Sequence, residues 1–122
     1  MRWIQLISLV TFLTTSVAFA EKTPAATEAW TMIKSGALVV DVRSADEFAT
    51  GHLDGALNIP HDSIAKRAAE LGTDKERQVV LYCKSGRRAG LAQQTLASLG
   101  FSKLQNAGGY QDLIDSKLID SK

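Results

Sequence analysis

The hydrophobic pattern of residues 21–122 alternates between short continuous apolar runs and longer stretches whose apolar residues recur at helical spacing. Continuous runs rich in valine and leucine predict strands that are buried on both faces. These runs occupy residues 37–43, 55–60, 78–83 and 101–107. The periodic stretches predict amphipathic helices. They occupy residues 28–34, 45–50, 63–71, 87–99 and 110–115.

Residues that favour caps and turns separate these segments. Ser44 and Glu47 match the S-x-x-E capping box that marks a helix start. Asp62 or Ser63 can cap the helix that follows the second strand. The pair Gly108–Gly109 predicts a turn between the last strand and the last helix.

The alternating order of helices and strands predicts the class of fold. Strands joined through helices pair in parallel, with right-handed crossovers and with helices on both faces of the sheet. We therefore expect an α/β protein, an open three-layer α/β/α sandwich with a mainly parallel sheet of four or five strands. The length of 122 residues suffices for one domain, and we place that domain at residues 21–122.

Composition and charge add limits to this picture. The apolar fraction of 45% and the charged fraction of 22% are typical of a globular domain. A net charge of +1 argues against a surface that binds nucleic acid or anionic membranes as a whole. Any anion-binding function must therefore come from a local cluster.

The first twenty residues, MRWIQLISLVTFLTTSVAFA, form a separate segment. Arg2 precedes an uncharged, largely apolar run that ends on Ala18-Phe19-Ala20. This is the pattern of a secretory signal peptide with an A-x-A cleavage site. The alternative, a retained membrane anchor, fits poorly because five serines and threonines interrupt the run. We expect cleavage after Ala20 and export of the domain.

The chain has one cysteine, Cys83, which ends the third apolar run. Exported proteins meet an oxidising compartment, where a lone thiol cannot form an internal disulfide. It is then buried, joined to another chain, or kept for chemistry. Because ligands of parallel α/β sheets bind beyond the carboxyl ends of the strands, Cys83 is expected at the functional edge.

The residues after Cys83 are suited to hold an anion. Gly86 allows successive N–H groups to point into one concavity, and the helix that follows adds the partial positive charge of its N-terminus. Lys84, Arg87 and Arg88 add three cations. A thiolate is an anion, so the loop predicts a nucleophilic cysteine. Two alternatives are an inert strand-end cysteine and a passive phosphate or sulfate site, although the spacing matches no P-loop or dinucleotide motif.

The hexapeptide Cys83-Lys84-Ser85-Gly86-Arg87-Arg88 resembles the C-x-x-G-x-R active-site loop of the rhodanese (thiosulfate sulfurtransferase) family. Two further segments resemble that family, VVDVRSADEFATGHLDGALNIP at residues 39–60 and LQNAGGYQDL at residues 104–113. Together they cover most of the expected domain. The chain departs from the family pattern at Leu113, where a tryptophan is common, and we expect this difference to affect packing alone.

The resemblance implies a single-domain, periplasmic sulfurtransferase of rhodanese-like fold. Cys83 would take the sulfane sulfur of thiosulfate as a persulfide and pass it to cyanide or a thiol. The residues implied to form the substrate-binding loop are Lys84, Ser85, Gly86, Arg87 and Arg88. No metal or organic cofactor is implied. The expected partners are a small-molecule sulfur donor and a thiophilic acceptor, without nucleic acid or membrane after signal cleavage, and we expect a monomer.

Two related functions compete with sulfur transfer. Cysteine phosphatases and arsenate reductases of similar fold have a C-x5-R loop, whereas Arg88 follows Cys83 in a C-x4-R loop. The shorter loop suits a sulfane sulfur better than a phosphoryl group. A non-catalytic module of the same family is the other alternative, but such modules typically lack the cysteine that this chain has.

Four further polar residues are considered as candidates for a role in the site. Asp41 and Arg43 end the first predicted strand and so are expected at the same edge as the loop. Asp41 can either orient a loop arginine or form a plain ion pair, and we treat both residues as supporting the site. His52 and His61 suggest a cysteine–histidine pair, but their spacing does not support one. We expect His52 to be structural and His61 to lie at the surface.

Overall fold

The computed structural model describes residues 23–120, with side chains described through residue 117. Helices and strands alternate in this range as predicted. The elements are α1 (Pro24–Lys34), β1 (Leu38–Asp41), α2 (Ala45–Ala49), β2 (Leu57–Asn58), η1 (His61–Ser63), α3 (Ile64–Arg67), η2 (Ala68–Leu71), β3 (Gln78–Cys83), α4 (Arg87–Ser98), β4 (Lys103–Gly109) and α5 (Tyr110–Asp120), where η denotes a short 3₁₀ helix. The predicted signal peptide lies outside the described residues. Among the described helices, none has the length and apolar character of a membrane span.

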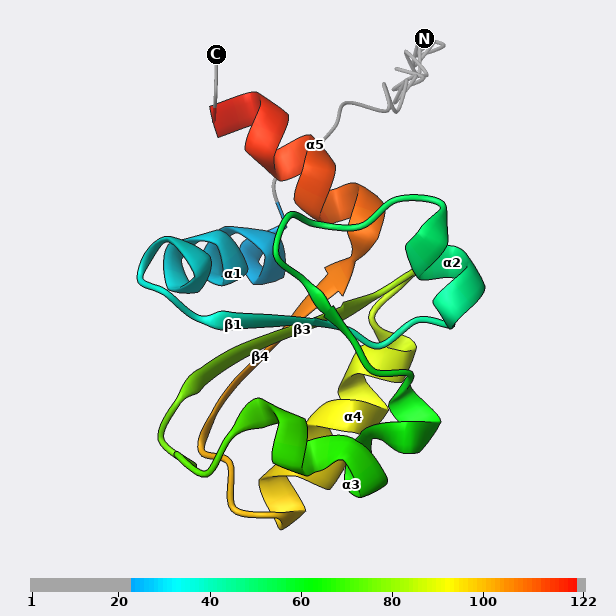
Figure 1. The fold of residues 1–122 in the computed structure, drawn as a ribbon. Coiled ribbons are helices and arrows are strands. Elements are labelled where there is room, and N and C mark those ends of the chain that lie inside the picture. The colour runs from blue at the N-terminus through cyan, green and yellow to red at the C-terminus, as the bar shows by residue number, and fades with distance from the viewer. Residues whose placement is uncertain (1–22, 121–122) are drawn as a thin grey trace, which may run out of the picture.

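The described strands form one four-stranded parallel sheet in the order β2-β1-β3-β4. β1 and β3 occupy its centre, with Leu38 paired to Val79 and Asp41 paired to Tyr82. The carboxyl ends of these central strands therefore lie side by side at the same end of the sheet. α2 and the start of α4 lie at this end too (Figure 1). The predicted α/β class with a parallel sheet of four strands is confirmed.

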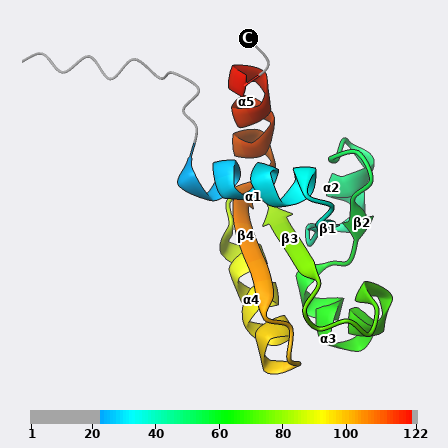
Figure 2. The same cartoon turned by 90° about the vertical axis from the view of Figure 1, so that its left-hand side faces the viewer.

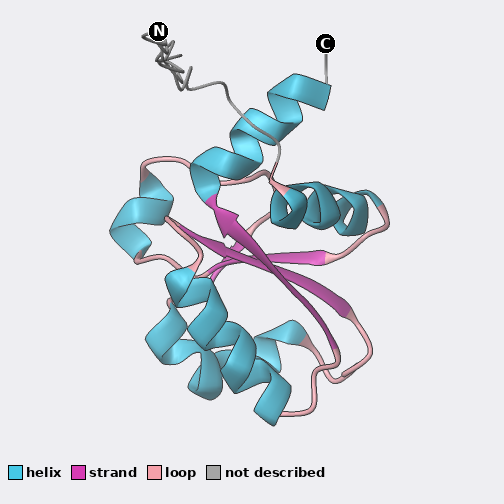
Figure 3. Ribbon diagram, turned by 180° about the vertical axis from the view of Figure 1, so that it is seen from behind, coloured by secondary structure: helices cyan, strands magenta, loops and turns pink. Residues whose placement is uncertain are grey.

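Helices cover both faces of the sheet, with α1 and α5 on one face and α3 and α4 on the other (Figures 1 and 2). The same three layers are visible from behind in Figure 3. The described residues form one hydrophobic core on each face of the sheet, and successive side chains of β3 point alternately into the two. Val79 and Leu81 pack on the side of α3 and α4. Val80 and Tyr82 pack on the side of α1 and α5. Each buried aliphatic side chain stabilises the fold by about 1.5–3 kcal/mol of transfer free energy. Leu113 is fully buried in the α1 and α5 core.

Three strands have bounds that differ from the prediction. β1 ends at Asp41, so Arg43 follows this strand rather than ending it. Gly108 and Gly109 do not form the predicted turn. They extend β4, because Gly109 pairs with Cys83 of β3. The register shifts between Leu81 and Cys83, which is the mark of a bulge. β2 is limited to Leu57–Asn58, since only these residues pair with β1.

The helix boundaries also differ in places. α1 begins at Pro24, earlier than predicted, because the Thr23 side chain accepts a hydrogen bond from the N–H of Ala26 at 3.0 Å and proline is favoured in a first turn. The expected helix at 63–71 is instead divided among η1, α3 and η2.

The predicted caps have mixed outcomes. Ser63 precedes α3 but makes no side-chain capping hydrogen bond, and Asp62 lies inside η1. The prediction that one of these two residues caps the helix is therefore wrong. The capping box of Ser44 and Glu47 at the start of α2 is confirmed.

Candidate active site

Cys83 is the last residue of β3, as predicted, and lies against the α3 and α4 core with 1% of its surface exposed. Its Sγ accepts a hydrogen bond from the N–H of Gly86 at 3.0 Å. A hydrogen bond from an N–H group stabilises a thiolate more than a neutral thiol. The contact therefore places a backbone donor directly at the sulfur.

Gly86 occupies a position that only glycine fits well. It precedes α4 with a φ of +98°, in the left-handed region that side chains rarely adopt. A Cβ at this position would lie 3.2 Å from the Cα of Gly108, so space is also restricted. No side chain caps α4, and the N–H groups of its first turn point toward the loop with the partial positive charge of a 12-residue helix.

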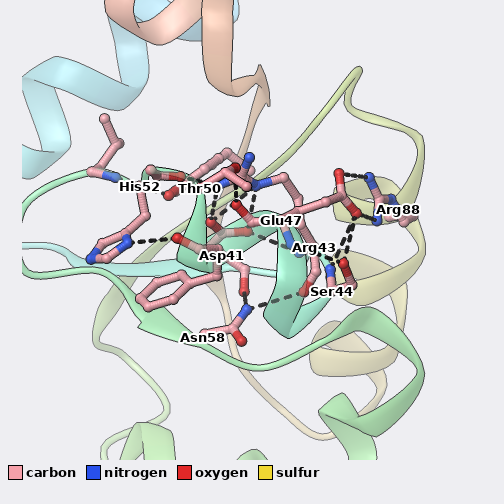
Figure 4. A network of polar contacts seen from close by, with 12 residues as sticks. Asp41, Arg43, Ser44, Glu47, Thr50, His52, Asn58 and Arg88 are labelled. Atoms are coloured by element: carbon pink, nitrogen blue, oxygen red, sulfur yellow. Dashed lines mark hydrogen bonds and ion pairs between the residues drawn. The ribbon is translucent and has the colours of Figure 1, made fainter.

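Arg88 is held in an ion pair with Glu47. Its Nη1 and Nη2 donate to the two carboxylate oxygens of Glu47 at 2.6 and 3.0 Å (Figure 4). Hydrogen bonding to Arg88 lowers the pKa of Glu47 to about 2. Glu47 also accepts from Ser44 in the capping box of α2. Arg88 therefore joins the start of α4 to α2.

Asp41 and Arg43 form a buried ion pair at the end of β1 (Figure 4). Arg43 Nη2 donates to Asp41 Oδ2 at 2.6 Å and to the carbonyl of Gly51 at 2.7 Å. The hydrogen bonds to Asp41 raise the pKa of Arg43, whose guanidinium lies 4.7 Å from the centre of the Tyr110 ring. The side chain of Asp41 therefore takes part in a plain ion pair, which is one of the two roles considered for it.

The outer face of the loop carries the unpaired charge. Lys84, Ser85 and Arg87 are exposed, and no ion pair among residues 23–117 includes Lys84 or Arg87. Lys84 also borders a cavity of about 300 Å³ beside the loop. The lining residues are Arg43, Glu47, Thr50, Lys84, Tyr110 and Gln111.

Several residues of this region were not predicted from the sequence. The sequence identifies Glu47 only as a capping residue. It predicts a turn at Gly108–Gly109, between Asn106 and Tyr110, whereas these glycines belong to β4. Asn106 Nδ2 donates to the carbonyl of Gly86 at 2.9 Å, although 20 positions separate the two residues. The residues around Gly108–Gly109 belong to a segment with family resemblance, which is the only sequence signal that could have pointed to them.

The histidines lie apart from the thiol chemistry. The Nδ1 of His52 lies 2.9 Å from the carbonyl of Phe48 (Figure 4). The rings of His52 and Phe48 stack with centroids 3.6 Å apart. These contacts hold the His52 ring against α2. The backbone N–H of His61 donates to the carbonyl of Val42 at 3.0 Å, and this residue is partly exposed. Within the described residues, no hydrogen bond joins either histidine to Cys83.

Fold and site together define a class of protein, a parallel α/β domain that holds one thiol at the start of a glycine-containing loop, where the carboxyl ends of its strands lie. The family described as Rhodanese-like domain matches residues 25–115. The chain belongs to that family, as the three sequence segments predicted.

Individual relatives agree with this membership. Thiosulfate sulfurtransferase PspE of Escherichia coli is 35% identical over 79 residues, which are 65% of this chain and 76% of the relative. The human thiosulfate:glutathione sulfurtransferase is 32% identical over 100 residues, 70% of this chain and 87% of the relative. A solved rhodanese with anions from E. coli superposes with a TM-score of 0.60 at 35% identity, covering 63% of this chain and 91% of the other. These similarities support sulfurtransferase activity.

Proposed function

We propose that this protein is a thiosulfate sulfurtransferase that works by double displacement through Cys83. The observation that carries the proposal is the N–H of Gly86 aimed at Sγ from 3.0 Å, at the start of α4. A thiolate, a persulfide anion and an anionic donor all gain from that arrangement of donors and helix dipole. The similarity to relatives named as thiosulfate sulfurtransferases supports the same conclusion.

The proposed reaction has two steps. In the first, the Cys83 thiolate attacks the outer sulfur of thiosulfate, the sulfur–sulfur bond of thiosulfate breaks, and sulfite leaves with the bonding electron pair. Cys83 then carries a persulfide anion. In the second, cyanide or a thiolate attacks the outer sulfur of this persulfide. Thiocyanate or a low-molecular-weight persulfide leaves, and the Cys83 thiolate is restored. The two steps together need no other oxidant or reductant.

The surrounding residues would have distinct roles in these steps. The exposed cations Lys84 and Arg87 would attract the dianionic donor, because their charge is not offset by an ion pair among the described residues. The backbone of Ser85 and Gly86 would surround the sulfur. The ion pairs of Arg88 with Glu47 and of Arg43 with Asp41 would hold the loop and the end of β1 in place.

The acceptor would approach from the cavity that Lys84 borders. Its volume of about 300 Å³ suits a small molecule. The exposed cation Lys84 at its border favours an acceptor with a carboxylate. The relative named thiosulfate:glutathione sulfurtransferase makes a small thiol a reasonable acceptor class.

The test is to incubate the purified protein with thiosulfate alone and measure its intact mass. We expect a gain of one sulfur atom, reversed by cyanide with formation of thiocyanate. The Cys83→Ser variant should neither gain the sulfur nor release sulfite. Full turnover in Cys83→Ser would overturn the assignment, and rapid hydrolysis of an aryl phosphate with no reaction toward thiosulfate would favour the phosphatase alternative.

The proposal extends to the location of the protein. Residues 1–20 would direct export and be removed, so that a periplasmic domain begins at Glu21. Fractionation of cells that express the full chain, with the intact mass of the exported product, tests this directly. Retention of residues 1–20 in a membrane fraction would support an anchor instead. The expectation of a monomer is tested on the same sample by sedimentation equilibrium.

A further inference from the structure

The side chain of Asn106 bridges the end of β4 and the loop that follows Cys83. Its Nδ2 donates to the carbonyl of Gly86 at 2.9 Å, and its Oδ1 accepts from the N–H of Gly108 at 2.9 Å. The opposite orientation of the amide would place two acceptors together at Gly86 and two donors together at Gly108. The amide of Asn106 is therefore matched to both backbone groups.

The bridge acts on the residue that contacts the thiol. Gly86 directs its N–H to Cys83 Sγ and its carbonyl to Asn106 and to the N–H of Gly90. Glycine is the residue with the greatest backbone freedom, and here it holds a φ of +98°. Because one residue carries both contacts, fixing its carbonyl limits the rotation that would turn its N–H away from the sulfur.

The packing of β4 explains why this bridge comes from Asn106. Leu81 pairs with Asn106, but Cys83 pairs with Gly109, so β4 has one extra residue across the register shift. Bulges of this kind frequently redirect side chains beside active sites. A Cβ on Gly109 would lie 2.3 Å from the carbonyl oxygen of Lys84, which shows how closely the loop lies on this part of β4.

We propose that Asn106 is a positioning residue for the thiol loop, acting through Gly86 without touching the reacting sulfur. The inference rests on the proposed function in one respect, namely that Cys83 is the nucleophile. Asn106 holds the N–H of Gly86 toward Sγ and thereby keeps the sulfur reactive at neutral pH. Without the bridge, the folded protein retains its thiol but loses part of the stabilisation of the thiolate.

The experiment measures alkylation of Cys83 by iodoacetamide at pH 7 and pH 9.5 in the full domain. Asn106→Leu removes both hydrogen bonds and keeps the same number and branching of side-chain heavy atoms. Asn106→Ser leaves a hydroxyl near Gly108 but is too short to reach Gly86. A hydrogen bond to a charged group supplies enough stabilisation for about a tenfold effect. We expect both variants to react about tenfold more slowly at pH 7 and less than about twofold more slowly at pH 9.5, where an unassisted thiol is also ionised.

Asn58 provides a matched control, because its Nδ2 also donates to backbone carbonyls at a strand end, those of Asp41 and Arg43 at 3.0 Å. Asn58→Leu should weaken the fold and leave alkylation within about twofold of the wild type at both pH values. Wild-type alkylation rates in folded Asn106→Leu and Asn106→Ser would overturn the inference. Equal slowing in Asn58→Leu would also overturn it, since the effect would then be one of general stability.

The readout separates this inference from the proposed function. Alkylation reports the state of the thiol whether or not the protein transfers sulfur. A wild-type protein that forms no persulfide from thiosulfate would refute the proposed reaction and leave the alkylation comparison intact. If persulfide forms in the wild type but the Asn106 variants match it in alkylation, only the role of Asn106 is refuted.

Discussion

The guanidinium of Arg88 and the carboxylate of Glu47 make two parallel hydrogen bonds, at 2.6 and 3.0 Å, between the first turn of α4 and the first turn of α2. Glu47 lies 41 positions before Arg88 in the chain. The pair therefore connects α4, which follows the thiol loop in the sequence, to α2, which follows β1. A bidentate arginine–carboxylate pair also fixes the direction of the arginine, which an isolated charge does not.

Replacing Glu47 should weaken the fold at neutral pH and make its stability less sensitive to acid. The pKa of Glu47 is about 2 in the folded protein and near its ordinary value of 4.5 in the unfolded chain. The pair thus contributes stability above pH 4.5, and that contribution is lost as the pH falls toward 2. Because the Glu47 side chain is 32% exposed, solvent screening limits the contribution to about 1 kcal/mol. Urea unfolding of Glu47→Gln should show that deficit at pH 7 and less than half of it at pH 3.

The exposed pair of Arg67 and Glu70 supplies the control for this measurement. It is also a close arginine–carboxylate pair, at 2.6 Å, but its side chains are 40% and 42% exposed. Glu70→Gln should unfold at the same urea concentration as the wild type. A Glu47→Gln deficit that persists unchanged at pH 3 would contradict the assigned role of the Glu47 carboxylate.

Gly109→Ala should disturb the thiol loop directly. The new Cβ would lie 2.3 Å from the carbonyl oxygen of Lys84, so either β4 or the loop must move. Overpacking of this kind destabilises by about 2 kcal/mol, and we expect slower alkylation of Cys83 as well. Gly90→Ala within α4 is the comparison, because its Cβ would lie 3.5 Å from Asn106 Nδ2, an ordinary contact distance. Replacing a glycine inside a helix should stabilise by about 0.5–1 kcal/mol. A Gly109→Ala variant that matches the wild type in thermal unfolding and alkylation would refute the close approach.

Asp41→Asn should destabilise the fold strongly. It leaves the buried Arg43, which is 6% exposed, without its counter-ion. Breaking a buried pair by removing one partner destabilises by about 3–5 kcal/mol, because an uncompensated charge remains. The double variant Asp41→Leu with Arg43→Met removes both charges and should be more stable than Asp41→Asn in urea unfolding. A double variant less stable than Asp41→Asn would show that the other contacts of Arg43 dominate.

Lys84→Gln should weaken the use of thiosulfate without removing the nucleophile. Losing one exposed cation near a dianion reduces attraction by about 1 kcal/mol, a roughly fivefold rise in KM with little change in kcat. The effect should shrink in high salt, since exposed charges are screened. Lys103→Gln, an exposed lysine at the start of β4 and so at the opposite end of the strand, should leave KM unchanged. Equal effects of the two substitutions would indicate only a general response to net charge.

The sequence determined the class of fold and the place of the thiol. Apolar runs and helical periodicity depend on neighbouring residues, and they placed Cys83 at the end of β3 without knowledge of the partner strands. The same local signals identified the capping box of Ser44 and Glu47. The composition of the loop also indicated an anion site, because glycine and cations near a helix start act on the same few atoms.

The connections among the residues around the thiol depend on tertiary contacts that the sequence does not reveal. The partner of Arg88, the bridge from Asn106 to Gly86 and the extension of β4 to Gly109 all depend on the register between strands and on helix packing. These contacts join residues 20 or more positions apart. Periodicity carries no information about such distances, because the register is set by which side chains pack together once the sheet has formed.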